Sequence, residues 1–179
     1  IHPGKTKVMR ARAKNTWPVT IKGKDIEDVD VFTHLGSTVT ADGANEVDVK
    51  SRLGKAKYAY IILRPICRSK QYSVNTKLRF YKSNVLSVLL YGSEAWKVTK
   101  SITSQLETFQ NRCLRRIFNI YWPDKIKNED LLQKASLKPV TLEIKRRRWR
   151  WLGHVLRMPP DAHPRIALKW TPDGKRPRG

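Results

Sequence analysis

The sequence predicts an α+β fold that is predominantly helical, with a short β region followed by a series of helices. Two patterns indicate this order: apolar residues alternate within residues 1–44, and from residue 45 onwards they recur at intervals of three and four positions. Gly and Pro residues separate the segments. The chain has 179 residues and is 40% hydrophobic, which is sufficient for a folded domain rather than a disordered tail.

The β region is expected to contain a hairpin. Residues 19–21 and 29–35 flank a Gly23-Lys24 turn and are expected to pair with each other, while residues 5–10 form a separate extended run. The Asp42-Gly43 dipeptide predicts the turn that closes this region.

Helical spacing predicts five helices, and their expected ranges are residues 45–63, 73–91, 104–120, 128–135 and 141–158. Residues with capping or helix-breaking chemistry mark their ends: Asn45, Pro65, Ser73, Gly92, the capping-box pair Ser104 and Glu107, Pro123 and Pro159. Each of the first three helices carries one apolar stripe, and three such stripes can close a single core. The basic, Pro-rich residues 159–179 are expected to be flexible.

The charge of the chain predicts an anionic partner. The chain carries 37 Lys and Arg against 15 Asp and Glu, a formal net charge of +22. Residues 45–120 hold 15 basic and 4 acidic residues and residues 121–179 hold 15 and 6, whereas residues 1–44 hold 7 and 5. Unbalanced charge of this size repels itself unless phosphates offset it, so a polyanion is expected to bind. A merely solvated basic surface is the alternative.

The helix expected over residues 141–158 divides into two faces at 100° per residue. One half-turn carries apolar side chains: Leu142, Ile144, Trp149, Trp151, Leu152, Val155 and Leu156. The opposite side carries basic side chains: Arg146, Arg147, Arg150, His154 and Arg157. We expect the apolar face to pack with Trp149 in the core, while Trp151 is open between the core and base stacking. Lys145 and Arg148 fall inside the apolar half and are expected to extend their charged ends to solvent.

The basic side of this helix suits phosphate groups, because guanidinium groups bind phosphate oxygens in pairs. The candidate nucleic-acid ligands on this and the 73–91 helix are Arg146, Arg147, Arg150, Arg157, Lys77, Arg79 and Lys82. The last three do not share one helix face, so at most two of them could meet one nucleic-acid backbone. A basic amphipathic helix could also lie on an acidic membrane, but the sequence contains no lipidation motif and nucleic acid is favoured.

The sequence offers little for catalysis or metal binding. It contains no Gly-rich phosphate loop, no G-x-S-x-G motif and no H-E-x-x-H motif. Cys67 and Cys113 lie 46 positions apart and are expected to be buried, reduced thiols, and the four His residues show no ligand spacing. Asp28 and Asp30 could share one strand face, but two-metal catalysis needs further carboxylates, so neither a catalytic residue nor a metal site is expected. No apolar run approaches the roughly 18 residues of a membrane span.

Five stretches occur in an order that resembles one protein family: Lys5–Met9 (KTKVM), Phe32–Ser37 (FTHLGS), Leu89–Trp96 (LLYGSEAW), Cys113–Ile117 (CLRRI) and Arg148–Met158 (RWRWLGHVLRM). Together they resemble the C-terminal part of reverse transcriptases from non-LTR, LINE-type retrotransposons, and most of all those of RTE-like elements. The resemblance covers almost the whole chain.

The resemblance implies a role for each segment. Residues 1–44 would be the end of the palm with the primer grip, and residues 45–120 would be a thumb-like helical bundle that clamps the template–primer duplex. Residues 121–158 would be a basic post-thumb region, and residues 159–179 a basic Pro-rich tail. The primer-grip-like residues would be Phe32, His34, Leu35 and Gly36.

In this family the catalytic palm aspartates precede the Lys5–Met9 stretch. The chain is therefore expected to be a fragment of an RNA-directed DNA polymerase with no polymerase activity and no cofactor of its own, because Mg²⁺ would belong to the palm of the parent protein. Its expected partners are RNA or DNA and the missing palm domain, not a membrane, and its expected location is intracellular and nuclear. The alternatives are a degenerate retroelement remnant and a basic interaction module.

Overall fold

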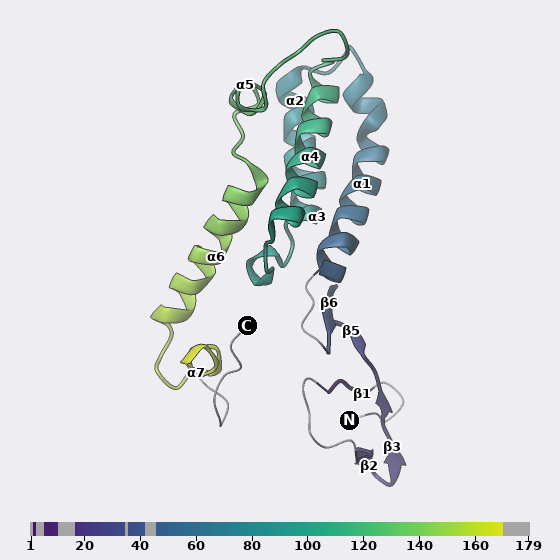
Figure 1. The fold of residues 1–179 in the computed structure, drawn as a ribbon, viewed down its shortest axis with the longest axis vertical. Coiled ribbons are helices and arrows are strands. Elements are labelled where there is room, and N and C mark those ends of the chain that lie inside the picture. The colour runs from purple at the N-terminus through teal and green to yellow at the C-terminus, as the bar shows by residue number, and fades with distance from the viewer. Residues whose placement is uncertain (1, 3–5, 11–16, 35, 42–45, 170–179) are drawn as a thin grey trace.

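The computed structural model describes residues 2, 6–10, 17–34, 36–41 and 46–169, and it confirms an α+β fold that is predominantly helical. Short strands occupy one end of an elongated molecule, and α1, the α2–α3 segment and α4 run alongside one another in the helical part (Figure 1). Helix α6 lies along the edge of the molecule opposite to α1 (Figure 1).

The strands are short, and those in the described ranges form three separate pairs. These are β1 (Lys7–Val8) with β4 (Glu27–Asp28) in parallel, β2 (Thr20–Ile21) with β3 (Lys24–Asp25) antiparallel, and β5 (Val31–His34) with β6 (Ser37–Thr40) antiparallel. The expected pairing of residues 19–21 with 29–35 is wrong, because each segment folds back onto the residues that follow it. Lys22 and Gly23 both have positive φ (52° and 74°), which forms the tight turn between β2 and β3. The turn expected at Asp42-Gly43 lies outside the described residues.

Helix α1 (Glu46–Arg68) is longer than expected, because Pro65 lies inside it and does not end it. A proline in the last turn removes only its own N–H donor, and the turn beyond it persists. The Ser69 N–H donates to the Pro65 carbonyl at 3.0 Å. The expected N-cap, Asn45, lies outside the described residues.

The second helical segment begins and ends as predicted. It consists of α2 (Val74–Phe80), the π-helical η2 (Tyr81–Leu86) and α3 (Ser87–Leu89). Ser73 is its N-cap, since its hydroxyl oxygen accepts from the Thr76 N–H at 3.2 Å. Gly92 follows it with a φ of 72°, and the short 3₁₀ helix η3 (Ser93–Ala95) comes next.

Helix α4 (Lys100–Ile117) begins and ends earlier than the expected range of 104–120. Its N-cap is Thr99, whose hydroxyl oxygen accepts from the Ile102 N–H at 3.3 Å. The predicted capping box of Ser104 and Glu107 is therefore wrong, because both residues lie within the helix. Thr99 has the same capping chemistry and stands one turn earlier.

The remaining helices are α5 (Asn128–Lys134), α6 (Val140–Arg157) and α7 (His163–Lys169). The first two agree with the predicted ranges to within one residue. The chain leaves α4 through Asn119, which has a φ of 56°, so α4 ends before Pro123 is reached. Within the tail that was expected to be flexible, residues His163–Lys169 form α7, and residues 170–179 lie outside the described residues. In the part of the chain that is described, no helix combines the length and hydropathy that crossing a membrane requires.

The apolar stripes of α1, the α2–α3 segment and α4 close one core, as the sequence predicts. Its most deeply buried side chains come from all three: Ala56, Tyr81, Val85, Leu89, Leu106, Leu114 and Ile117. The same core continues into α5 and α6 through Leu131, Val140 and Ile144, so α6 is held against the bundle by apolar burial.

Polar contacts join the β5–β6 hairpin to the first turns of α1, at a site that we call the Asp48 junction. The Thr38 N–H donates to Asp48 Oδ1 at 2.9 Å, and the indole N–H of Trp96 donates to Asp48 Oδ2 at 2.7 Å. Asp48 is only 4% exposed, so both bonds are made in a dry environment. One carboxylate therefore ties together the hairpin, α1 and the segment that follows η3.

Arg52, one turn further along α1, completes the junction. Its Nη2 donates to the Gly36 carbonyl at 2.6 Å, and its guanidinium lies 4.4 Å from the centre of the Tyr91 ring. Gly92 is required there by its positive φ and by space, since a Cβ atom at this position would approach Ser37 Oγ to 2.8 Å. The Phe32–Ser37 and Leu89–Trp96 stretches, distant in sequence, thus meet at one place.

Candidate nucleic-acid interface

The packing face of α6 differs from the predicted one. Val140, Ile144 and Val155 are buried, whereas Trp149 is 70% exposed, so the prediction of Trp149 as a core residue is wrong. At 100° per residue Trp149 lies about 140° from Ile144, on the solvent side of the helix. Trp151 lies nearer the packing face and is 46% exposed.

Two arginines explain this rotation of α6. Arg147 Nη1 donates to the Leu90 carbonyl at 2.9 Å, and Arg148 donates from Nε to the Glu94 carbonyl at 3.2 Å and from Nη2 to the Trp96 carbonyl. The Leu90 carbonyl also accepts from the Ser93 N–H at 3.3 Å, so Arg147 adds a second donor to it, while Arg148 supplies donors to carbonyls at and just after η3. Sequence reasoning missed this role, because it assigned Arg148 to solvent and Arg147 to phosphate.

The outward side of α6 carries three exposed arginines, which we call the α6 arginine face: Arg146, Arg150 and Arg157. They fall within an arc of about 40° on the helix, so they can meet one nucleic-acid backbone together. Glu143 lies beside this face, 3.9 Å from Arg146 Nη1 and 3.6 Å from Arg147 Nε. Exposed ion pairs of this kind are weak, so a phosphate can replace the carboxylate.

A hollow of about 370 Å³ lies between α6 and the second helical segment. Its cationic lining side chains are Lys82, Lys138, Arg146 and Arg147, and we call it the basic groove. The structure thus brings Lys82 together with two of the four predicted α6 arginines. Lys138 was not predicted, because it precedes α6 and belongs to no helical pattern.

The other two predicted basic residues of the second helical segment differ in exposure. Lys77 is 4% exposed and does not line the basic groove. Arg79 is exposed, and with Lys82 it lines a separate hollow of about 540 Å³. Lys82 is the residue that faces both hollows.

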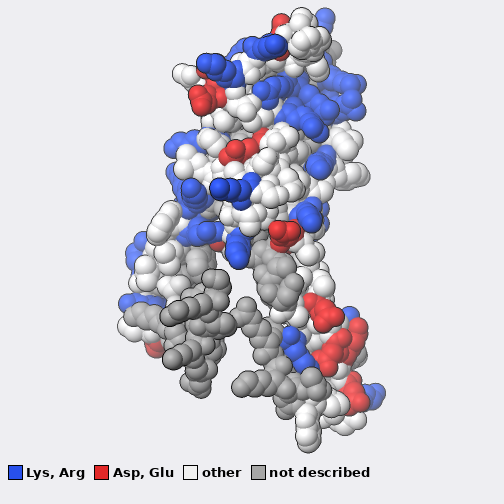
Figure 2. Space-filling view, in the orientation of Figure 1, with Lys and Arg blue, Asp and Glu red and all other residues white. Residues whose placement is uncertain are grey.

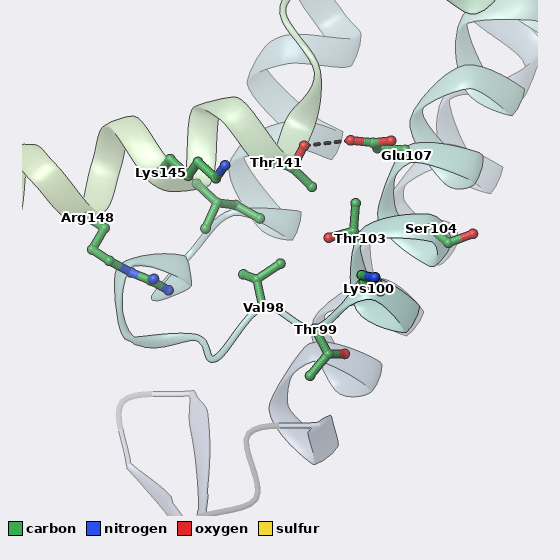
Figure 3. A pocket seen from close by; sticks show the side chains of 10 residues that line it. Val98, Thr99, Lys100, Thr103, Ser104, Glu107, Thr141, Lys145 and Arg148 are labelled. Atoms are coloured by element: carbon green, nitrogen blue, oxygen red, sulfur yellow. Dashed lines mark hydrogen bonds between the residues drawn. The ribbon is translucent and has the colours of Figure 1, made fainter.

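A further hollow, of about 520 Å³, lies on the other side of α6 against the start of α4 (Figure 3). Lys145 and Arg148 extend toward it from α6, and Lys100 lines it from α4. The Thr141 hydroxyl donates to Glu107 at 2.5 Å along its edge. Basic side chains therefore flank α6 on both sides.

One group of acidic residues lies at the strand end of the molecule. Figure 2 shows Lys and Arg over much of the helical body with a few Asp and Glu among them, and a group of Asp and Glu over the strands. There Glu27 pairs with Lys7 at 3.2 Å and Asp28 with Arg10 at 2.9 Å. Among the described residues, no group of three or more His, Cys, Asp or Glu side chains could hold a metal ion.

The primer-grip-like residues lie in the β5–β6 hairpin. Phe32 is partly buried and His34 ends β5, while Leu35 lies outside the described residues. Gly36 has a φ of 80° and accepts the Arg52 hydrogen bond of the Asp48 junction. The hairpin is thus fixed to α1 and does not contribute to the basic groove.

The two cysteines are buried and unpaired, as predicted. Burial raises the pKa of the Cys113 thiol to about 12 and also raises that of Cys67. Both thiols are therefore neutral and unreactive in the folded protein at physiological pH.

Comparison with known proteins gives two similarities. Residues 59–91, from α1 through α3, match a family described as a domain of unknown function (DUF6451). The chain is also 26% identical over 183 aligned residues to an uncharacterised transposon-derived protein of Caenorhabditis elegans. The alignment covers 96% of this chain but spans 64% of the length of that relative, and no solved structure matches.

Proposed function

We propose that this chain is a nucleic-acid-binding segment of a retrotransposon reverse transcriptase of the non-LTR type. In this proposal it holds template–primer duplex or element RNA against the basic groove and the α6 arginine face. The observation that carries the proposal is the convergence of Lys82, Lys138 and Arg146 on one groove, continued along α6 by Arg150 and Arg157. Such a row of cations matches the repeated phosphates of a nucleic acid.

Two further observations support the reverse-transcriptase assignment. The relative from Caenorhabditis elegans is named as transposon-derived, and retrotransposons are one class of transposon. The Phe32–Ser37 and Leu89–Trp96 stretches, on which the resemblance rests in part, meet at the Asp48 junction through contacts that require Gly36, Gly92 and Trp96. Both stretches therefore contribute to one structural site.

The proposal assigns catalysis to a palm domain outside this chain, together with the Mg²⁺ that polymerisation requires. The purified chain should incorporate no labelled nucleotide on a primed RNA template in Mg²⁺ or Mn²⁺. Incorporation above a no-protein control that is abolished by Asp28→Ala would contradict this assignment. A degenerate remnant or a basic interaction module is the alternative, and it would bind neither duplex nor single strands.

The test of nucleic-acid binding is the salt dependence of affinity. Changing Arg146, Arg150 and Arg157 together to Gln should flatten the slope of log K against log salt by about two to three phosphate equivalents, at roughly 0.9 per phosphate on duplex and 0.7 on single strands. The matched control changes Lys55, Arg64 and Arg68, exposed residues of α1, to Gln with the same loss of charge.

In the salt series the control should keep a steeper slope than the α6 variant, because α1 lies at the opposite edge of the molecule from α6 (Figure 1). Gln and Arg have similar helix propensities, so helix content should not change in either variant. Equal slopes for the two variants would show that the α6 arginine face does not contact phosphates and would reject the proposal.

A further inference from the structure

The segment between α4 and α5 presents two aromatic rings to solvent. Trp122 is 82% exposed and Tyr121 is 55% exposed, next to a turn in which the Asp124 N–H donates to the Tyr121 carbonyl at 2.8 Å. Both rings line a hollow of about 510 Å³ against the last turns of α4. Large aromatic side chains held at the surface beside a hollow are typical of a binding site.

The wall of this hollow is basic. Arg112, Arg115 and Arg116 line it from one side of α4, and no acidic residue is among its lining residues in the described part of the chain. Arg115 holds the following segment in place, since its Nη2 donates to the Ile126 carbonyl at 3.2 Å and to Asn128 Oδ1 at 2.7 Å. Arg112 and Arg116 are exposed and form no ion pair among the described residues, so they can meet an anion.

Asn111 supplies an independent observation. It lines the same hollow and is 8% exposed, and its Oδ1 is buried without a hydrogen-bond partner within the described structure. Buried acceptors are nearly always paired in folded proteins, whereas this oxygen has almost no exposed surface and no partner, so a ligand in the hollow supplies its donor only when the side chain turns toward the hollow. An amide side chain is suited to the amino and ring-nitrogen edge of a nucleobase.

We propose that this hollow is a binding site for single-stranded nucleic acid, separate from the α6 surface. Unpaired bases stack on Trp122 and Tyr121, and Arg112 and Arg116 bind the adjoining phosphates. The Asn111 side chain turns toward the bound base, so that its Oδ1 accepts from a base amino group. A duplex does not fit this chemistry, because its bases already stack on one another and expose no face to a protein ring. The Lys125 Nζ lies 5.6 Å from the centre of the Trp122 ring and adds a further cation beside the stacked base.

The site faces away from α6. Gln110 lies on the side of α4 toward α6, where its Nε2 donates to the Lys138 carbonyl at 3.0 Å. Arg112 follows two positions later, and two positions correspond to about 200° around a helix. The two proposed surfaces can therefore be altered independently.

The test replaces Trp122 by Ala and measures binding of three probes: a 20-nucleotide single strand, a duplex of the same length (~20 base pairs), and a ~20-unit strand without bases. Loss of one stacking contact should weaken single-strand binding about tenfold, while affinity for the duplex and for the abasic strand should change less than about twofold. Trp122→Phe should restore most of the affinity, because Phe also stacks. The single strand is tested as RNA and as DNA, and the ratio of the two losses identifies which of them this site prefers.

The matched control is Trp17→Ala, which removes another highly exposed tryptophan (78%) in the strand region and should leave all three affinities unchanged. Circular dichroism and thermal unfolding verify that each variant is folded. If Trp122→Ala leaves single-strand binding unchanged, the proposal is overturned. This is the result expected if the hollow binds a protein partner. An equal loss on all three probes also overturns the proposal. The α6 arginine variant reports on the proposed function separately, because its effect extends to the duplex and to the abasic strand.

Discussion

The two ends of α1 are held by different chemistry. Its first turns, with Asp48 and Arg52, hold the β5–β6 hairpin through directed hydrogen bonds. Its later turns, with Ala56, Tyr60 and Leu63, are buried in the apolar core of the bundle. The stabilisation from apolar burial is proportional to the buried area and tolerates exchange among side chains of similar volume. The Asp48 junction depends instead on particular donor and acceptor atoms at fixed positions. The bundle should therefore carry most of the stability, and the junction should fix the position of the hairpin.

The largest effect is expected in the apolar part. Leu106→Ala removes a side chain with no exposed surface and should lower the free energy of unfolding by about 2–5 kcal/mol, measured by urea denaturation. Leu156→Ala is the control: it changes a leucine on α6 that is 47% exposed and should cost less than about 0.5 kcal/mol. Similar losses for the two variants would mean that the bundle core does not dominate stability.

A smaller effect, confined to one region, is expected at the junction. Asp48→Asn replaces one accepting oxygen by an amide that faces an N–H donor, and it should cost about 1–3 kcal/mol. Amide hydrogen exchange should quicken in β5 and β6 more than in α4, because the hairpin loses its attachment while the bundle keeps its core. The control is Asp28→Asn, whose side chain is 50% exposed and whose ion pair with Arg10 should be worth about 0–1 kcal/mol. If Asp48→Asn quickened amide hydrogen exchange in α4 as much as in β5 and β6, the bundle and the hairpin would unfold as one cooperative unit.

The effect that is smallest near neutral pH comes from a buried thiol. The folded pKa of Cys113 is about 12, above the value of about 8.5 in an unfolded chain, so the unfolded state loses this proton first. The stability should therefore be constant below about pH 8.5 and fall above it, by at most about 1.4 kcal/mol per pH unit for this group. Urea denaturation at a series of pH values between about 7 and 10 measures this, below the pH at which an ordinary tyrosine ionises.

The control for the pH series is Cys113→Ala, which keeps the raised pKa of Cys67. The free energy of unfolding of this variant should fall less steeply with pH than that of the unchanged protein. The same slope in both proteins would mean that the Cys113 thiol is not buried in the way the core packing indicates.

Local chemistry and periodicity made the helices predictable, but not the contacts between them. Ser73 could be identified as an N-cap from its position before an apolar stripe, yet the same reasoning chose Ser104 over Thr99, because both lie near the start of one stripe. The range of α6 was predicted, but the side of the helix that faces the bundle was not. The spacing of apolar residues does not reveal that Arg147 and Arg148 donate to carbonyl groups of a distant segment.

The candidate sites show the same division. The predicted Arg146 and Lys82 do meet in one groove, but Lys138 and the hollow beside Trp122 were missed. The position of Lys138 and the hollow beside Trp122 both depend on which irregular segment lies against which helix. Irregular segments have no periodic sequence pattern, so the sequence does not predict these contacts. Strand pairing failed for a related reason, because the turn at Lys22 and Gly23 required two positive φ angles, and a lysine gives little sign of that preference.

The attachment of α6 has a consequence for sequence drift. Arg147 and Arg148 bind backbone carbonyls of Leu90, Glu94 and Trp96, and every amino acid presents the same carbonyl group. The receiving segment can therefore change its side chains without losing these acceptors, while the two donors on α6 cannot change without losing the bonds. The constraint is one-sided, and a lineage that accumulates substitutions keeps these bonds by preserving two arginine codons, provided that the buried Val140 and Ile144 stay apolar.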